Sequence, residues 1–175
     1  FYNLSTDARW IKIEDAQIKK METKRGRKYE NVEVTKELWR IGMKDQAYYS
    51  EIAIAEKKYG HKSSTSDSLW KLKEKLNETN LQSVKKIIDK YGWPKGSVFG
   101  RGATNAVFLV IQHSEYETQK KYLPLLEEAC KNNEAPWENY ALMKDRILTD
   151  EKKSQIYGSQ LNYNEKLKVY ELFPL

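Results

Sequence analysis

The sequence predicts a compact, mainly α-helical domain with a small C-terminal β-hairpin. From residue 35 to about residue 150, apolar side chains recur every three or four positions, which is the spacing of one helix face. After residue 153 the pattern changes to the alternation that is typical of strands. The 175 residues are enough for a single domain with one core, and 5 Trp and 12 Tyr exclude a disordered chain.

Residues 1–34 form an N-terminal arm in this interpretation, ahead of a helical domain over residues 35–175. Residues 10–13 and 31–34 could be short strands around a basic turn, or parts of an extended arm. The turn is strongly basic, because residues 19–28 contain six Lys or Arg and one Glu. Such a segment could contact phosphates, but no nucleic-acid-binding motif accompanies it. We therefore expect a solvated loop rather than a nucleic-acid site.

Three helices are predicted between residues 35 and 91. Thr35 is a suitable N-cap for the first, and a polar linker over residues 61–67 separates it from the second, which Ser66 or Asp67 would cap. Gly92-Trp93-Pro94 ends the third, because a glycine followed by a residue held extended before proline stops a helix. The predicted ranges are 35–59, 69–76 and 81–91, and Thr79-Asn80 would cap the third helix.

Asp45 interrupts the apolar stripe of the first of these helices. The stripe keeps helical spacing only if Asp45 fills the position between Ile41 and Tyr48. Because a buried carboxylate is costly unless it is paired, we expect it to be buried and bonded to Arg146, His113 or backbone N–H groups. The alternatives are a stripe that bends away at this point and a purely structural ion pair.

The second half of the domain contains three further predicted helices. Residues 103–111 are apolar nearly all round, as expected for the central helix. Ser114 and Glu117 form a capping box for the next helix, in which Pro124 would introduce a kink or a restart and Gln119 faces inward. Pro136 opens the last helix, whose inward residues include Trp137.

Residues 154–163 and 167–173 are predicted to be two strands around a turn at Asn164-Glu165. We expect this hairpin to pack against the helix that ends at His113.

Familiar catalytic signatures are absent from the sequence. It has no phosphate-binding glycine loop, zinc-protease motif or paired cysteines, and only two histidines, His61 and His113. We therefore expect no metal and no cofactor. The single cysteine, Cys130, lies on an inward helix face and is expected to be an inert core residue.

His113 is the leading candidate for chemistry. It follows the most apolar helix and precedes a tight corner, so that its ring lies near the core at a helix end. Histidine is the side chain best suited to proton transfer near neutrality. The alternative role is a helix-terminal residue that only caps carbonyl groups.

A set of spaced motifs resembles a bacterial domain family of unknown function. Its members have a Gly-Trp-Pro turn, a Gln-His pair, an Asp-Arg pair and a Gln-x-Tyr-Gly-Thr-Gln stretch in this order. The residues that carry the resemblance are Asp45-Gln46, Gly92-Trp93-Pro94, Gln112-His113, Asp145-Arg146 and Gln155-x-Tyr157-Gly158-Ser159-Gln160. The likeness covers residues 36–163 and implies a polar pocket, but no known reaction.

Two classes of function are compatible with these residues. The first is a metal-independent acid–base enzyme, a hydrolase or lyase acting on a small polar or anionic substrate. In it His113 would transfer protons, Asp45 or Asp145 would orient it, and Arg146 would hold an anionic group. Further substrate contacts would come from Gln112, Gln119, Gln155, Tyr157 and Gln160. The second is a non-catalytic ligand-binding or interaction module whose polar cluster fixes the hairpin to the helices.

No apolar run approaches the roughly 20 residues that span a bilayer, so we expect a soluble protein with no membrane partner. The chain begins at Phe1, and both a cytoplasmic protein and an exported one that has lost its signal peptide would fit.

Overall fold

The computed structural model describes residues 7–26, 28–29, 31–164, 167 and 169–174. They form a mainly helical fold that ends in a two-stranded antiparallel hairpin, which confirms the predicted fold class. The elements are α1 (Ala8–Arg25), α2 (Val32–Gln46), α3 (Tyr49–Tyr59), α4 (Ser64–Tyr91), α5 (Gly96–Phe99), α6 (Arg101–Gln112), α7 (Tyr116–Lys131), α8 (Trp137–Asp150), β1 (Leu161–Asn164) and β2 (Val169–Leu172).

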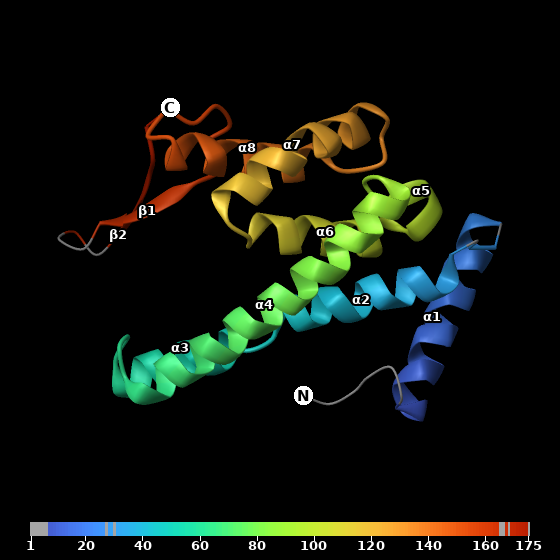
Figure 1. Ribbon diagram of the computed structural model, residues 1–175, viewed down its shortest axis with the longest axis horizontal. Helices are drawn as coiled ribbons and strands as arrows, with labels where there is room; N and C mark the ends of the chain where they lie inside the picture. Colours follow the sequence, from blue (N-terminus) through green and yellow to red (C-terminus); the bar gives the residue numbers. More distant parts are fainter. Residues whose placement is uncertain (1–6, 27, 30, 165–166, 168, 175) are drawn as a thin grey trace.

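Helix α6 occupies the centre of the fold, as its all-round apolar sequence predicts. It lies between α2 on one side and the α7–α8 pair on the other, and α4 crosses beside it (Figure 1). Fully buried side chains from all these helices meet around it. They include Leu38, Val84, Val107, Ile111, Leu126 and Met143.

Helices α2 and α6 cross in very close contact. A Cβ atom placed on Gly42 of α2 would lie 2.9 Å from the Cβ of Ala106 in α6. Only glycine allows this approach, because two carbon atoms pack no closer than about 3.5 Å. Asp45 lies one turn further along α2, so this crossing carries it toward the C-terminal end of α6.

The expected strands or extended arm at residues 10–13 and 31–34 are wrong for the described residues. The first region lies within α1, whose N-cap Asp7 accepts hydrogen bonds from the backbone N–H groups of Arg9 and Trp10. The second lies at the start of α2. Helix capping and the burial of Glu14 and Ile18 on one face of α1 outweigh a short alternating run.

The predicted helix over residues 35–59 is interrupted. Ala47 is extended and Tyr48 has a left-handed backbone with φ of 72°, so α2 ends at Gln46 and α3 begins at Tyr49. The break begins at Ala47, two residues after Asp45. Asp45 itself lies within α2 and is buried, so the alternative in which the apolar stripe bends away from it is wrong.

The two helices predicted at 69–76 and 81–91 are in fact one, α4. Thr79 and Asn80 do not cap a new helix: the Thr79 hydroxyl donates to the carbonyl of Lys75 within α4, and Asn80 is buried. The N-cap is Ser63, whose hydroxyl oxygen accepts from the N–H of Ser66. The predicted end before Gly92 is confirmed.

Three details of the second half also differ from expectation. The Ser114 hydroxyl donates back to the carbonyl of Ile111, so no capping box forms and α7 starts after Glu115. Pro124 lies inside α7, so the alternative in which the helix restarts there is wrong. Trp137 is 48% exposed rather than turned inward, whereas Gln119 is buried as predicted.

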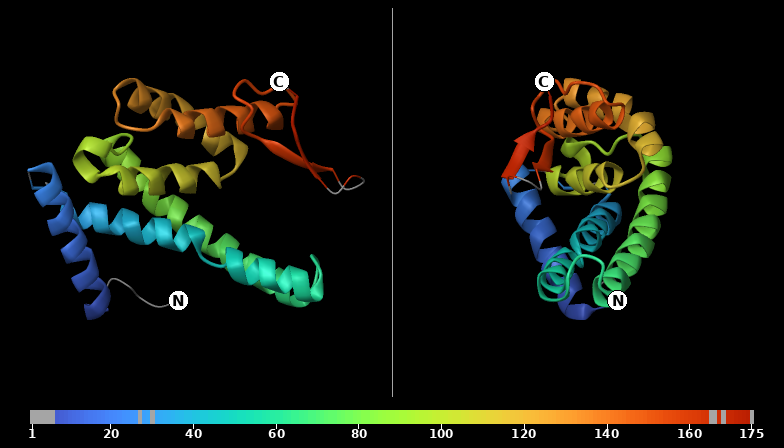
Figure 2. Two further views of the ribbon diagram at one scale, coloured as in Figure 1. Left: turned by 180° about the vertical axis from the view of Figure 1, so that it is seen from behind. Right: turned by 90° about the vertical axis from the view of Figure 1, so that its left-hand side faces the viewer.

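The hairpin is shorter than predicted. Strand β1 pairs with β2 in the register Leu161 opposite Leu172 and Asn164 opposite Val169, and Glu165 of the predicted turn lies outside the described residues. Residues 155–160 form no strand because their backbone binds an acidic side chain of α8, as described below. The hairpin and α1 lie at opposite ends of the molecule (Figure 2).

No helix among the described residues is both long enough and apolar enough to cross a membrane.

Candidate functional site

A buried carboxylate and a partly exposed histidine form the centre of the candidate site. Asp45, in the last turn of α2, is 1% exposed, and His113 is the C-cap of α6. The Nδ1 atom of His113 lies 3.1 Å from Oδ1 and 2.9 Å from Oδ2 of Asp45. The expectation that Asp45 is buried and bonded to His113 is confirmed. Because a carboxylate only accepts, the geometry favours a proton on Nδ1.

Two neighbours hold Asp45 in place. The side-chain amide of Gln46 donates to Oδ2 over 2.8 Å. Lys73 of α4, which is 1% exposed, donates from Nζ to the backbone carbonyl of Asp45 and, over 2.8 Å, to the side-chain oxygen of Asn77. Burial lowers the pKa of the Lys73 ammonium, and the nearby negative charge of Asp45 opposes this shift.

Tyr49, the first residue of α3, completes the surroundings of the pair. Its ring packs edge-on against the His113 ring at 5.9 Å, and the Lys73 ammonium lies over its face at 4.5 Å. Burial raises the pKa of the Tyr49 hydroxyl, and Asp45 raises it further, while the charge of Arg146 acts in the opposite direction. Four helices, α2, α3, α4 and α6, therefore meet at this site.

The sequence analysis missed Lys73 and Tyr49. A signal for Lys73 was present, because Ser66, Lys73, Asn80 and Ile87 recur every seven residues and are all buried on α4. This stripe continues through the position at which a helix boundary was predicted. Tyr49 carried no such signal, since the break before it is not evident from the residue spacing.

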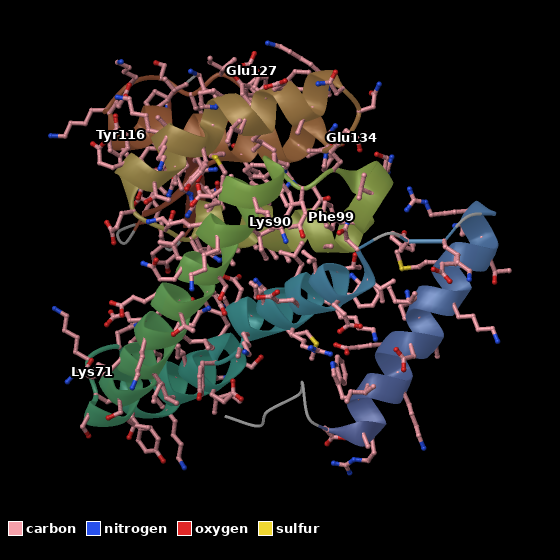
Figure 3. All side chains as sticks on the ribbon, turned by 45° about the vertical axis from the view of Figure 1, so that its right-hand side comes forward. Lys71, Lys90, Phe99, Tyr116, Glu127 and Glu134 are labelled. Carbon is pink, nitrogen blue, oxygen red and sulfur yellow. The ribbon has the colours of Figure 1, made fainter. Side chains whose placement is uncertain are left out.

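The exposed side of His113 borders a groove of about 380 Å³. One wall is α4 and the other is the corner between α6 and α7. In Figure 3, Lys71 marks the first half of α4 and Tyr116 the start of α7. The residues that line the groove are Glu74, Asn77, Glu78, Leu81, Val110, His113, Ser114 and Glu115.

The predicted residues Gln112, Gln119 and Arg146 support the end of α6 from behind. The Arg146 guanidinium and the Gln119 amide both donate to the backbone carbonyl of Gln112, over 3.1 and 3.2 Å. Gln119 also donates to the carbonyl of Ser114 over 2.7 Å. These bonds satisfy carbonyl groups on either side of His113, at a helix end where such groups have no helical partner. None of the three lines the groove.

Asp145 belongs to a different cluster. Its carboxylate is completely buried and accepts hydrogen bonds from the backbone N–H groups of Ile156, Tyr157 and Ser159 and from the Ser159 hydroxyl. Burial raises the pKa of this carboxyl, but the combined hydrogen bonds outweigh burial and lower it. Asp145 therefore fixes the backbone conformation of the segment after α8.

Gln155 and Gln160 form further hydrogen bonds in the same segment. Gln155 is buried, accepts from the N–H of Gln160 over 2.9 Å and donates to the carbonyl of Phe173 over 2.7 Å. Gln160 donates to the carbonyl of Leu142 in α8 over 3.2 Å. These bonds tie the hairpin region to α8, whereas we expected it to pack on α6. The predicted ligand residue Tyr157 is half exposed, with its ring against Tyr140.

The remaining candidates lie outside this site. His61 is exposed and lies 3.1 Å from a Glu56 oxygen. Cys130 is buried, and this burial raises the pKa of its thiol to about 11. Among the described residues, no group of three His, Cys, Asp or Glu side chains is arranged to hold a metal ion.

A family model of unknown function, DUF6624, matches residues 32–173. The chain belongs to this family. The DUF6624 region includes residues 36–163, over which the motifs are spaced, and both clusters described above. Helix α1 precedes it. The chain has no match among curated proteins or among solved structures.

Proposed function

We propose that this DUF6624 domain is a metal-independent acid–base enzyme, a hydrolase or lyase that acts on a small polar substrate in the groove beside His113. One observation carries the proposal. A buried carboxylate, Asp45, binds Nδ1 of a histidine whose ring also lines a groove of about 380 Å³.

In this mechanism His113 exchanges a proton with the substrate through Nε2. Asp45 occupies Nδ1, which fixes the ring orientation and leaves the second nitrogen for the groove. A carboxylate in this position also stabilises the imidazolium that forms when the ring accepts a proton. Lys73 and Gln46 act as positioning residues, since they bond Asp45 rather than the groove.

The other predicted site residues have supporting roles in this proposal. Arg146, Gln112 and Gln119 hold the end of α6 so that His113 projects from a fixed position. Asp145, Gln155 and Gln160 hold the C-terminal segment on α8. Arg146 therefore does not serve as an anion clamp in the groove.

The test compares the two histidines of the chain. Wild type, His113→Gln and His61→Gln are incubated with pools of small polar metabolites, and turnover is followed by NMR. We expect wild type and His61→Gln to convert the same compound. His113→Gln should convert it about 10²- to 10⁴-fold more slowly, the usual contribution of one acid–base residue, while thermal melts should show that the variant is still folded.

The second candidate is a binding module without catalysis, and the extensive bonding of the motif residues to backbone carbonyls favours it. A compound that binds beside His113 and is recovered unchanged would support this alternative. Turnover that is equal in wild type and His113→Gln would refute the catalytic role of His113.

A further inference from the structure

The C-terminal hairpin projects from the helical part of the fold. In Figure 2 its two strands extend away from the helices. Seven of its eight paired residues are exposed, and Asn164 is partly exposed. A two-stranded hairpin on its own is at best marginally stable in water, and it gains stability when a hydrophobic face is packed.

The two faces of the hairpin differ in composition. Paired residues share a face, and successive residues of a strand point to opposite faces. The register therefore places four apolar or aromatic residues on one face: Leu161, Tyr163, Tyr170 and Leu172. The rings of Tyr163 and Tyr170 lie 5.0 Å apart, as expected for neighbours on one face. The opposite face consists of Asn162, Asn164, Val169 and Glu171.

All four residues of the apolar face are open to solvent. Tyr170 is 70% exposed, Leu161 56%, Leu172 53% and Tyr163 40%. An antiparallel sheet with one apolar and one polar face commonly packs the apolar face on a core. In this hairpin, none of the described residues buries the apolar face.

The apolar face carries no charge among its paired residues. Glu171 is the one charged residue at a paired position, and it lies on the opposite face. The protein as a whole has a net charge of +6, so two copies repel each other at long range. A contact between copies is least opposed where both present uncharged side chains.

We infer that two copies of this chain associate by packing the apolar faces of their hairpins against each other. A two-fold contact uses the same patch on both copies, and a second copy carries the matching apolar face. These uncharged side chains offer no charge that would select an acidic or basic partner. The inference goes beyond the proposed function, because the hairpin does not line the groove beside His113.

The exposed area fits a weak dimer. The four side chains expose roughly 500 Å² on each copy, so their contact buries about 1,000 Å² in total, the lower limit of a specific interface. Two hairpins packed in this way form a small β-sandwich with its sheets about 10 Å apart. An interface of this size predicts a reversible dimer with a Kd on the order of 10–100 µM.

Sedimentation of wild type over a range of concentrations tests the dimer. Between about 1 and 300 µM, the average mass should rise from that of the 20.6 kDa chain toward twice this value. Salt should strengthen the association, because it screens the repulsion between two positively charged copies. Raising NaCl from about 0.05 to 0.5 M should lower the Kd severalfold. A protein that stays monomeric throughout overturns the inference.

Two variants that each add one positive charge locate the contact. Tyr170→Lys places the charge on the apolar face and should raise the Kd at least about 30-fold. The control Asn162→Lys places it on the opposite face of the same hairpin, and its Kd should stay within about threefold of wild type. Cross-strand NOEs show whether each variant keeps the paired hairpin.

A measurement on wild type alone does not depend on the folding of any variant. In a mixture of isotope-labelled and unlabelled protein, filtered NOEs report contacts between different copies. We expect them between the methyl groups of Leu161 or Leu172 and the tyrosine rings of the other copy. A dimer without these NOEs, or one that both variants weaken equally, overturns the inference, because its contact then lies elsewhere on the chain.

Discussion

The carboxylate of Asp45 lies 2.9 Å from Nδ1 of His113, although 68 residues separate the two in the chain. Asp45 is in the last turn of α2 and His113 caps α6, so the pair joins the C-terminal ends of the two helices that pack most closely. The carboxylate is fully enclosed, while about a quarter of the His113 side chain reaches solvent. A buried acid paired with an accessible base is the arrangement from which our functional proposal begins.

Asp45 and His113 should be energetically coupled. Replacing Asp45 with Ala should lower the free energy of unfolding by about 1–3 kcal/mol, because the His113 ring loses its acceptor and the buried Lys73 ammonium loses a nearby negative charge. A double-mutant cycle with His113→Gln should give a coupling energy of about 0.5–3 kcal/mol in urea titrations. The exposed pair His61 and Glu56 is the control, with an expected coupling below about 0.5 kcal/mol. Equal coupling in both pairs would contradict the special role of the buried one.

Gly42 should not tolerate a methyl group. Its added Cβ would lie 2.9 Å from Ala106, so α2 and α6 must separate. We expect Gly42→Ala to destabilise the protein by about 1–3 kcal/mol. In the control Gly102→Ala, the new Cβ lies 3.5 Å from the Trp39 side chain, an ordinary contact, and alanine favours the helix by about 0.5–1 kcal/mol. Thermal melts of both variants should therefore shift in opposite directions.

Asp145→Asn should destabilise the fold by about 3 kcal/mol at neutral pH, because buried N–H donors lose a charged acceptor. The folded-state pKa of Asp145 is below its ordinary value of 3.8. Its contribution to stability is therefore complete above that value and is lost as the pH falls through the folded-state pKa. Urea titrations of wild type and variant should give a constant difference from neutral pH to about pH 4 that shrinks below it. A difference that grows under acid would refute this assignment.

The N-terminal helix should depend on one buried ion pair. Glu14 is 2% exposed, and its carboxylate accepts from the Arg40 guanidinium over 2.8 Å and from the Trp10 indole over 2.7 Å. Glu14→Gln should weaken the docking of α1 by about 3 kcal/mol. Hydrogen exchange should then quicken in α1 and stay unchanged in α6. Glu33, one of the two exposed partners of Lys36, is the control: Glu33→Gln should change little.

Cys130 should be unreactive in the folded protein. With its pKa raised to about 11 by burial, only on the order of 0.1% of the thiol is ionised at about pH 8. A thiol reagent should label it slowly in buffer and rapidly in guanidinium chloride. Rapid labelling of the native protein would show that this part of α7 opens.

Much of the fold was predictable because helix spacing and end signals are local. The apolar run at residues 103–111 predicted the buried central helix, and Gly92 marked the end of α4. The alternation after residue 153 predicted the hairpin. Among the site residues, Asp45 was predicted best, since its position on an apolar stripe was enough to predict that it is buried and has a bonded partner.

Other features depend on contacts between distant segments, and local patterns predicted them wrongly or not at all. The run at residues 10–13 alternates like a strand, yet α1 forms because Glu14 and Ile18 are buried on one helix face. Thr79 and Asn80 look like a helix boundary, yet α4 continues because the core buries Asn80 with Ser66 and Lys73.

The sequence by itself determined the helical class, the central helix and the burial of Asp45, because each follows from the spacing of apolar residues along a single element. Only the tertiary structure decided that Asp45 pairs with His113, that Asp145 instead binds the segment after α8, and that three glutamates surround the groove. These depend on how helices cross. The close contact between Gly42 of α2 and Ala106 of α6 fixes how these two helices cross, and the crossing decides which distant side chains come together. The spacing of residues within one helix does not contain that information.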